Sequence, residues 1–159
     1  MDGVSLLETL VAIAIIGILA LVAVPSYHDM IEGQRLRGAA EAMASDLRWA
    51  RSEAIKRGVP VRVAFGTGHD WNYSVVADAN GNGSFDDDAP LKVVAAADFP
   101  AVSLASASFA GNAQAFIEPV RATATEGVAV LSMPSRSASV SLSAAGMVGI
   151  CGLGAYQPC

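Results

Sequence analysis

Residues 4–24 read VSLLETLVAIAIIGILALVAV and contain a single charged side chain, Glu8. At a rise of about 1.5 Å per residue, a helix of this length spans about 31 Å, which matches the hydrocarbon core of a bilayer. The chain has 159 residues, of which 53% are hydrophobic, and this stretch concentrates much of that apolar content. We therefore expect a helix that crosses a membrane.

The flanks of this stretch differ from those of a cleaved secretory signal peptide. Residues 1–3, Met-Asp-Gly, carry no positive charge, and the apolar run ends in Val24-Pro25-Ser26, which is a poor cleavage site. Pro25 lacks a backbone donor, so we expect a kink there that need not end the helix. The expected organisation is a transmembrane helix over residues 4–28 and a globular domain over residues 29–159.

From residue 29 to residue 57 the helical pattern becomes amphipathic. Apolar residues at alternating steps of four and three form one stripe along the helix: Leu36, Ala40, Met43, Leu47, Ala50 and Ala54. The charged residues of this segment, Asp46 and Glu53 among them, lie off the stripe, and the basic ones are predicted to form a solvated or subunit-facing surface. Gly58 is a suitable helix stop.

Beyond Gly58 the chain changes to short runs rich in β-branched and aromatic residues. Strands are expected at Val61–Phe65, Trp71–Ala77, Leu91–Ala95, Phe116–Ile117, Val128–Met133, Val140–Leu142 and Met147–Cys151. The Ala/Ser-rich stretch from Ala101 to Ser108 carries little information. A helix followed by strands predicts an α+β fold, in which the helix stripe packs on one face of an antiparallel sheet.

Glu8 is the most informative single residue. A charge inside a membrane helix costs about 2.5–3.5 kcal/mol on insertion scales and usually marks a function. If the chain were cut after Gly3, the free α-amine of Val4 could neutralise Glu8, either within one subunit or between neighbours. Alternatively, the carboxyl is protonated or lies at the level of the lipid headgroups.

Gly3, Glu8 five positions later, and the apolar run LLETLVAIAIIGILALVAVPSY from Leu6 to Tyr27 resemble the class III signal of type IV pilins and pseudopilins. The resemblance implies that prepilin peptidase removes residues 1–3 as a leader and methylates the new N-terminus at Val4. It also implies that Glu8 sets the register of the subunit in a filament by pairing with a neighbour's amine. Val4 stands where the family usually has phenylalanine.

The segment AAEAMASDLRWARSEAIKRG, from Ala39 to Gly58, is similar to minor pilins and pseudopilins of the GspH/FimT/FimU type. This resemblance implies a type IV pilin fold and a structural role in a type IV pilus or a type II secretion pseudopilus, at or near the tip. The expected partners are other pilins or pseudopilins, which the N-terminal helix would contact. The expected location is the inner membrane, with a single membrane pass and a periplasmic C-terminal domain, and then the assembled filament.

The stretch Asp78-Ala-Asn-Gly-Asn-Gly-Ser-Phe-Asp86-Asp-Asp matches part of a calcium-binding loop. Asp78, Asn80, Asn82 and Asp86 occupy the first, third, fifth and ninth positions of an EF-hand-like pattern. The twelfth position, which should be a bidentate glutamate, is Ala89. The alternative is a turn between strands, for which Asn-Gly pairs are well suited. No other cofactor is expected.

The two cysteines, Cys151 and Cys159, lie close to the C-terminal end of the sequence. Their spacing matches no common zinc-binding pattern. If the domain is exported, a disulfide that closes a short loop is the expected use, and free thiols are the alternative.

DNA uptake is an alternative function within the same family. FimT-type proteins that bind DNA resemble one another in a Gly-Arg-x-Arg stretch near the C-terminus, and the corresponding residues Gly146–Cys151 contain no arginine. The formal net charge of −5 also gives no electrostatic case for nucleic acid.

No pattern in the sequence indicates catalysis, so we expect no enzyme. His28 and His69 have no metal-ligand or nucleophile spacing, and no serine lies in a Gly-x-Ser-x-Gly turn. A second alternative is a single-pass periplasmic binding domain that does not polymerise.

Overall fold

The computed structural model describes residues 5–121 and 123–152, and within the helix it describes no side chains for residues 20–26 and 28. The elements, in chain order, are α1 (Leu6–Arg57), β1 (Val61–Gly66), β2 (Asn72–Ala77), β3 (Pro90–Ala95), the short 3₁₀ helix η1 (Ala96–Asp98), β4 (Ser103–Phe109), β5 (Gln114–Ile117), β6 (Gly127–Met133), β7 (Arg136–Leu142) and β8 (Val148–Cys151).

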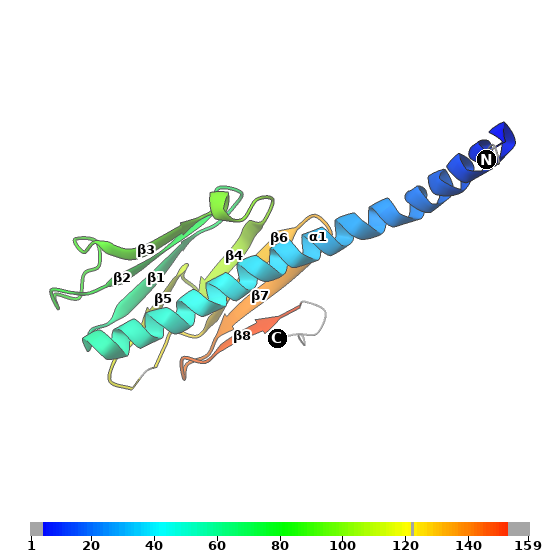
Figure 1. Cartoon of the computed structure of the whole chain (residues 1–159). Coiled ribbons are helices and arrows are strands. Elements are labelled where there is room, and N and C mark those ends of the chain that lie inside the picture. The colour runs from blue at the N-terminus through cyan, green and yellow to red at the C-terminus, as the bar shows by residue number, and fades with distance from the viewer. Residues whose placement is uncertain (1–4, 122, 153–159) are drawn as a thin grey trace.

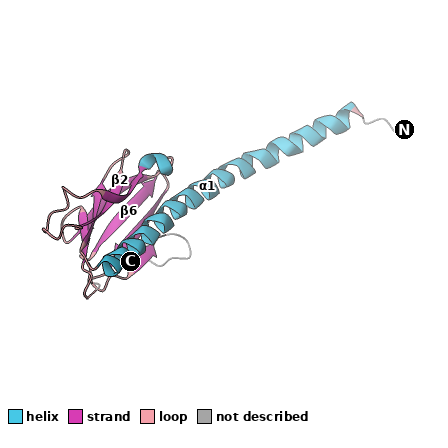
Figure 2. Cartoon of the chain, turned by 60° about the vertical axis from the view of Figure 1, so that its left-hand side comes forward, coloured by secondary structure: helices cyan, strands magenta, loops and turns pink. Residues whose placement is uncertain are grey.

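One helix of 52 residues, α1, forms the axis of the molecule. Its N-terminal half projects away from the strands, and its C-terminal half lies along them (Figures 1 and 2). The helix continues through Pro25 and ends at Gly58, whose φ of 70° is the left-handed conformation that glycine adopts without strain. The backbone N–H of Gly58 donates to the carbonyl of Ala54.

The described strands form two antiparallel sheets, where the sequence predicted one. The first has the order β3-β2-β1-β5 and the second the order β4-β6-β7-β8. The sheets meet where the backbone of Gly68, in the loop between β1 and β2, exchanges two hydrogen bonds with that of Leu104 in β4. The helix contacts β1 and β5 of the first sheet and β6, β7 and β8 of the second.

The predicted apolar stripe of α1 is the helix side of the core. All six of its members are buried: Leu36, Ala40, Met43, Leu47, Ala50 and Ala54. The facing strands bury alternate residues, as β1 does with Val61, Val63 and Phe65, which is the period of a sheet with one covered face. Each large side chain buried in this way contributes about 1.5–3 kcal/mol relative to its exposed state.

Aromatic rings fill the space between the two sheets. Phe65 stacks on Phe109 at 5.1 Å between ring centroids, and Trp71 stacks on Tyr73 at 6.1 Å. The indole N–H of Trp71 donates to the carbonyl of Val102 at 2.7 Å, so this buried polar atom is satisfied. The ring cluster therefore joins strands of both sheets into one core.

Candidate assembly surface and polar sites

The N-terminal half of α1 presents a long row of exposed apolar side chains. Those exposed by more than half of their surface are Leu6, Leu7, Leu10, Val11, Ile13, Ile15, Ile16, Ile18 and Leu19. Exposed apolar area of this extent marks a surface that contacts protein or lipid. Counting only residues whose side chains the structure describes, no helix has an apolar segment long enough to cross a bilayer. The predicted span of residues 4–28 includes residues 4, 20–26 and 28, which lie outside that description.

Glu8 lies in the first turn of this exposed helix. Ser5 caps the helix: its hydroxyl oxygen accepts from the backbone N–H of Glu8 at 3.2 Å. The Glu8 carboxylate forms no salt bridge within residues 5–121 and 123–152. An acidic side chain in a first turn is favoured by the helix dipole, which supplies partial compensation. Gly3 and Val4, the predicted processing site, lie outside the described residues.

Two carboxylates that the sequence placed off the helix stripe are in fact buried. Asp46 is 8% exposed and Glu53 is 7% exposed. The phenol of Tyr73 donates to Asp46 Oδ2 at 2.8 Å, and the ammonium of Lys92 lies 2.6 Å from Asp46 Oδ1. Burial, followed by the hydrogen bond to Asp46, raises the pKa of Tyr73 far above its usual value. Periodicity locates the centre of a buried face but not its width, so it gave no sign that these two off-stripe residues are buried.

Glu53 forms two ion pairs at the C-terminal end of α1. Arg57 Nε lies 2.7 Å from one carboxylate oxygen, and Lys56 Nζ lies 3.5 Å from the other. The hydrogen bond from Arg57 lowers the pKa of Glu53, although burial acts in the opposite direction. These two ion pairs join side chains one turn apart at the C-terminal end of the helix.

Two arginines on the other side of α1 bind the last strand of the second sheet. Arg48 donates to the carbonyl of Val148 at 3.1 Å, and Arg51 donates to the carbonyl of Gly146 at 3.2 Å. These guanidinium groups bind backbone carbonyls of β8 and of the turn before it, while the Arg48 side chain stays exposed and that of Arg51 is half-buried. The segment from Gly146 to Cys151, which would carry arginines in a DNA-binding relative, is thus the turn and strand that α1 itself holds.

The predicted calcium loop connects β2 to β3 and is shaped by its own hydrogen bonds. The Asp78 carboxylate accepts from the backbone N–H groups of Asn82 and Gly83 at 3.1 and 3.0 Å. The side-chain amides of Asn80 and Asn82 both donate to Asp87 Oδ2, at 3.0 and 2.9 Å. The backbone N–H of Asp87, followed by the amide of Asn82, lowers the pKa of the Asp87 carboxyl.

Asp86, the fourth predicted calcium ligand, forms an ion pair with Arg62 of β1. Its carboxylate is 2.9 Å from Arg62 Nη1, and the same guanidinium lies over the ring of Phe85 at 5.2 Å. In the part of the chain that the structure describes, no group of three or more His, Cys, Asp or Glu side chains is arranged to hold a metal ion. Calcium binding by Asp78, Asn80, Asn82 and Asp86 stays a prediction.

Cys151 is the last residue of β8 and takes part in a disulfide. Its predicted partner, Cys159, lies outside the described residues. The cysteine pairing therefore stays a prediction of the sequence.

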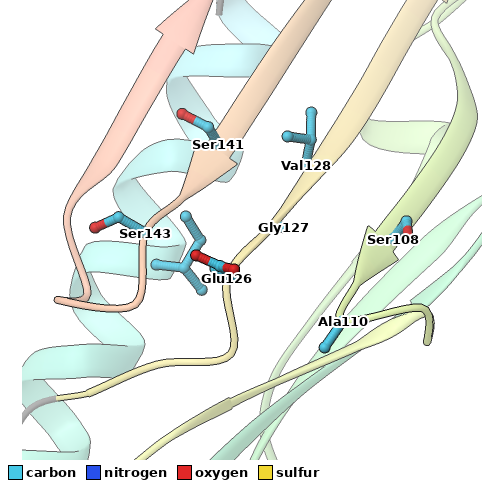
Figure 3. A pocket seen from close by; sticks show the side chains of 8 residues that line it. Ser108, Ala110, Glu126, Gly127, Val128, Ser141 and Ser143 are labelled. Carbon is cyan, nitrogen blue, oxygen red and sulfur yellow. The ribbon is translucent and has the colours of Figure 1, made fainter.

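Sequence reasoning missed two polar features of the globular domain. His69 Nδ1 and Ser103 Oγ are 2.9 Å apart, in a contact that joins the β1–β2 loop to β4. A hollow of about 470 Å³ also lies on the second sheet, lined in part by Ser108, Val128 and Ser141 from neighbouring strands (Figure 3). Only the pairing of strands brings these residues together, so no local sequence signal could have identified them.

Comparisons with known proteins agree with this architecture. The curated type II secretion system protein H of Xanthomonas campestris pv. campestris is 43% identical over 60 residues, which are 38% of this chain and 36% of that protein. The chain thus matches little more than a third of the length of this relative.

Two crystal structures of the type IV minor pilin FimU from Pseudomonas aeruginosa share the fold. One has a TM-score of 0.57 at 22% identity and covers 76% of this chain and 91% of FimU. The other has a TM-score of 0.53 at 21% identity and covers 72% and 91%. The type IV pilin fold, with a helix packed on antiparallel strands, is confirmed. Because the sequence model of the type II transport protein GspH family matches residues 39–146, more than half of the chain, the protein belongs to the GspH family.

Proposed function

We propose that this protein is a minor pilin or pseudopilin, a structural subunit that joins a filament through the exposed N-terminal half of α1. The observation that carries the proposal is the row of exposed apolar residues from Leu6 to Leu19, continuous with a folded GspH-family domain. Isolated in water, such a surface would be costly, at about 25 cal/mol for each Å² of apolar area. Packing against equivalent helices of neighbouring subunits would remove that cost.

In this proposal, Glu8 sets the axial register. Prepilin peptidase would cut after Gly3 and methylate Val4, and the new amine would pair with Glu8 of a neighbour. A subunit displaced by one helix turn would leave the carboxylate unpaired in an apolar surrounding, where a charge costs about 2.5–3.5 kcal/mol. The absence of a salt bridge to Glu8 within the described residues is consistent with a partner outside them.

Family membership associates the protein with the cell envelope. The finer location that we propose is the inner membrane, with residues 4–28 spanning it once and the globular domain in the periplasm, before assembly at or near the filament tip. The relative and the structural neighbours are named as a type II secretion protein and as a type IV minor pilin, so both filament types fit. DNA uptake is not supported, because the arginines expected near Gly146 are absent and α1 holds that turn.

The experiment that tests the proposal replaces Glu8 by alanine in the strain that makes the protein. Glu8→Ala should leave the subunit in the membrane fraction at the normal level but exclude it from sheared filaments, because the register-setting charge is lost. The matched control is Glu41→Ala, which removes a helix carboxylate from the globular part of α1. Normal amounts of the Glu8→Ala subunit in filaments would contradict the proposed role of Glu8.

A further inference from the structure

The point where α1 leaves the globular domain lies between Gly33 and Leu36. Leu36 is fully buried and is the first residue of the described helix to enter the core, whereas Tyr27 and Met30 are largely exposed. The apolar core therefore holds the helix only from Leu36 onward. Any further control of its direction must come from contacts just N-terminal to that residue.

The tip of the β6–β7 hairpin makes those contacts. The hairpin turns tightly, since Met133 at the end of β6 pairs with Arg136 at the start of β7. At this turn the hydroxyl of Ser135 donates a short hydrogen bond to Glu32 Oε2. The hairpin tip thus contacts the helix at Glu32, one turn before the first core residue, Leu36.

Arg136 makes the second contact, over Gly33. A Cβ atom placed on Gly33 would lie 3.4 Å from Arg136 Nη1, so the guanidinium rests where a larger side chain would project. Arg136 therefore occupies space that a side chain longer than that of alanine would need at this position. Glu32 and Gly33 on α1, with Ser135 and Arg136 on the hairpin, are called the helix clamp below.

The helix clamp lies far from the start of the helix, so a small change in helix direction at the clamp moves the N-terminal end by a large distance. From Gly33 to Leu6 the helix extends about 40 Å, so a change of about 10° in its exit direction moves its start by about 7 Å. That displacement exceeds one helix turn, which is about 5.4 Å. Long helices are rarely straight, and the described side chains of residues 5–19 are all exposed, so the domain does not brace that part of α1.

We infer that the helix clamp fixes the direction in which the exposed half of α1 leaves the globular domain, and that it thereby sets where the domain sits on the filament. Ser135, Arg136 and Gly33 are positioning residues in this role. Only the claim about the position of the domain on the filament rests on the proposed function. The claim about the direction of the helix concerns the isolated protein and can be measured without any filament.

The test uses the full-length protein in detergent micelles, with spin labels on Leu19→Cys and Ser106→Cys and with the native disulfide left intact. Leu19 lies about 21 Å along the helix from Gly33, so a change of about 10° moves its label by about 4 Å. The test variants are Gly33→Leu and the double variant Ser135→Ala/Arg136→Ala. The matched controls are Gly38→Leu, at an exposed helix glycine with nothing within 4 Å, and Ser137→Ala, at an exposed strand position.

We expect both test variants to broaden or shift the distance between the labels by several ångströms. The Tm of the test variants and the label distances of both controls should stay near the parent values. Distances unchanged in the double variant would overturn the clamp. The same variants, without labels, are then scored for incorporation into filaments, where we expect a loss of at least several-fold. Changed distances with normal incorporation would overturn the positioning role, and this outcome is separate from failure of the Glu8→Ala test.

Discussion

At the scale of single residues, charged side chains of α1 bind both sheets and so fix how the helix lies on them. Asp46 and Glu53 lie on the same helix face, and Asp46 binds Tyr73 and Lys92 of the first sheet. Arg48 and Arg51 lie on the opposite side and bind the β8 end of the second sheet. Wrong rotation of the helix would leave the buried Asp46 carboxylate without its partners, at a cost of about 1–3 kcal/mol or more.

The ion pairs of Glu53 predict a pH dependence of stability. The pKa of Glu53 is below its ordinary value in the folded protein, so the unfolded chain binds a proton at a higher pH than the folded one. The stabilisation is therefore complete above the ordinary pKa and is lost as the pH falls through the lowered one. Between about pH 6 and about pH 3, Tm should fall less for Glu53→Gln than for the parent protein.

Thermal unfolding followed by circular dichroism at each pH measures this difference. The control is Glu118→Gln, which changes an exposed glutamate in the loop after β5. Its Tm should run parallel to that of the parent protein over the whole range. A Glu53→Gln profile that also runs parallel would show that the ion pairs contribute nothing to folding.

At the scale of elements, the pairing of β4 with β6 depends on a glycine. Gly127 begins β6 opposite Phe109, and a Cβ there would lie 2.2 Å from the carbonyl oxygen of Ser108 and 2.5 Å from the Cα of Phe109. Both atoms belong to the backbone, so neither can move aside without separating the strands. Gly127 and Ser108 also line the hollow in Figure 3.

Alanine substitutions at two glycines should therefore have opposite effects. Gly127→Ala should lower the free energy of unfolding by about 1–3 kcal/mol or more through overpacking. Gly38→Ala, on an exposed helix turn with open space around it, should raise it by about 0.5–1 kcal/mol. Urea unfolding of the two variants at one temperature measures both values. Equal effects of the two substitutions would mean that the β4–β6 contact is looser than described.

At the scale of the whole molecule, the exposed helix and the folded domain are two parts with different tasks. The domain is held by one core between α1 and two sheets, while the described residues 5–19 of α1 remain exposed. This division suits a subunit whose domain is complete before assembly and whose helix is buried only in the filament.

The predicted processing and disulfide can be measured together on the intact protein. Mass spectrometry of the protein from its native membrane should show a chain that begins at N-methylated Val4. Without reduction, its mass should be lower by two hydrogens, because Cys151 and Cys159 are linked. A chain that retains Met1-Asp2-Gly3 where prepilin peptidase is active would remove the basis for assembly. Recovery of both cysteines as free thiols would contradict the disulfide.

Periodicity and composition by themselves determined the long helix, its buried stripe, its end at Gly58 and most of the strands, because these features depend on neighbours within a few residues. They also located the exposed apolar segment and Glu8. The strand β4 was missed because its sequence, SLASASF, has no β-branched residue, and its pairing with β6 is what makes it a strand.

Only the tertiary structure decided how many sheets form, which charges are buried and where the hairpin tip meets the helix. Residues 32 and 135 are far apart in sequence, and nothing near either one encodes their contact. The burial of Asp46 likewise depends on Lys92 and Tyr73, which a different pairing of the strands would place elsewhere. Local pattern fixes which way a residue faces, whereas the partner that it meets is set by how distant segments pack together.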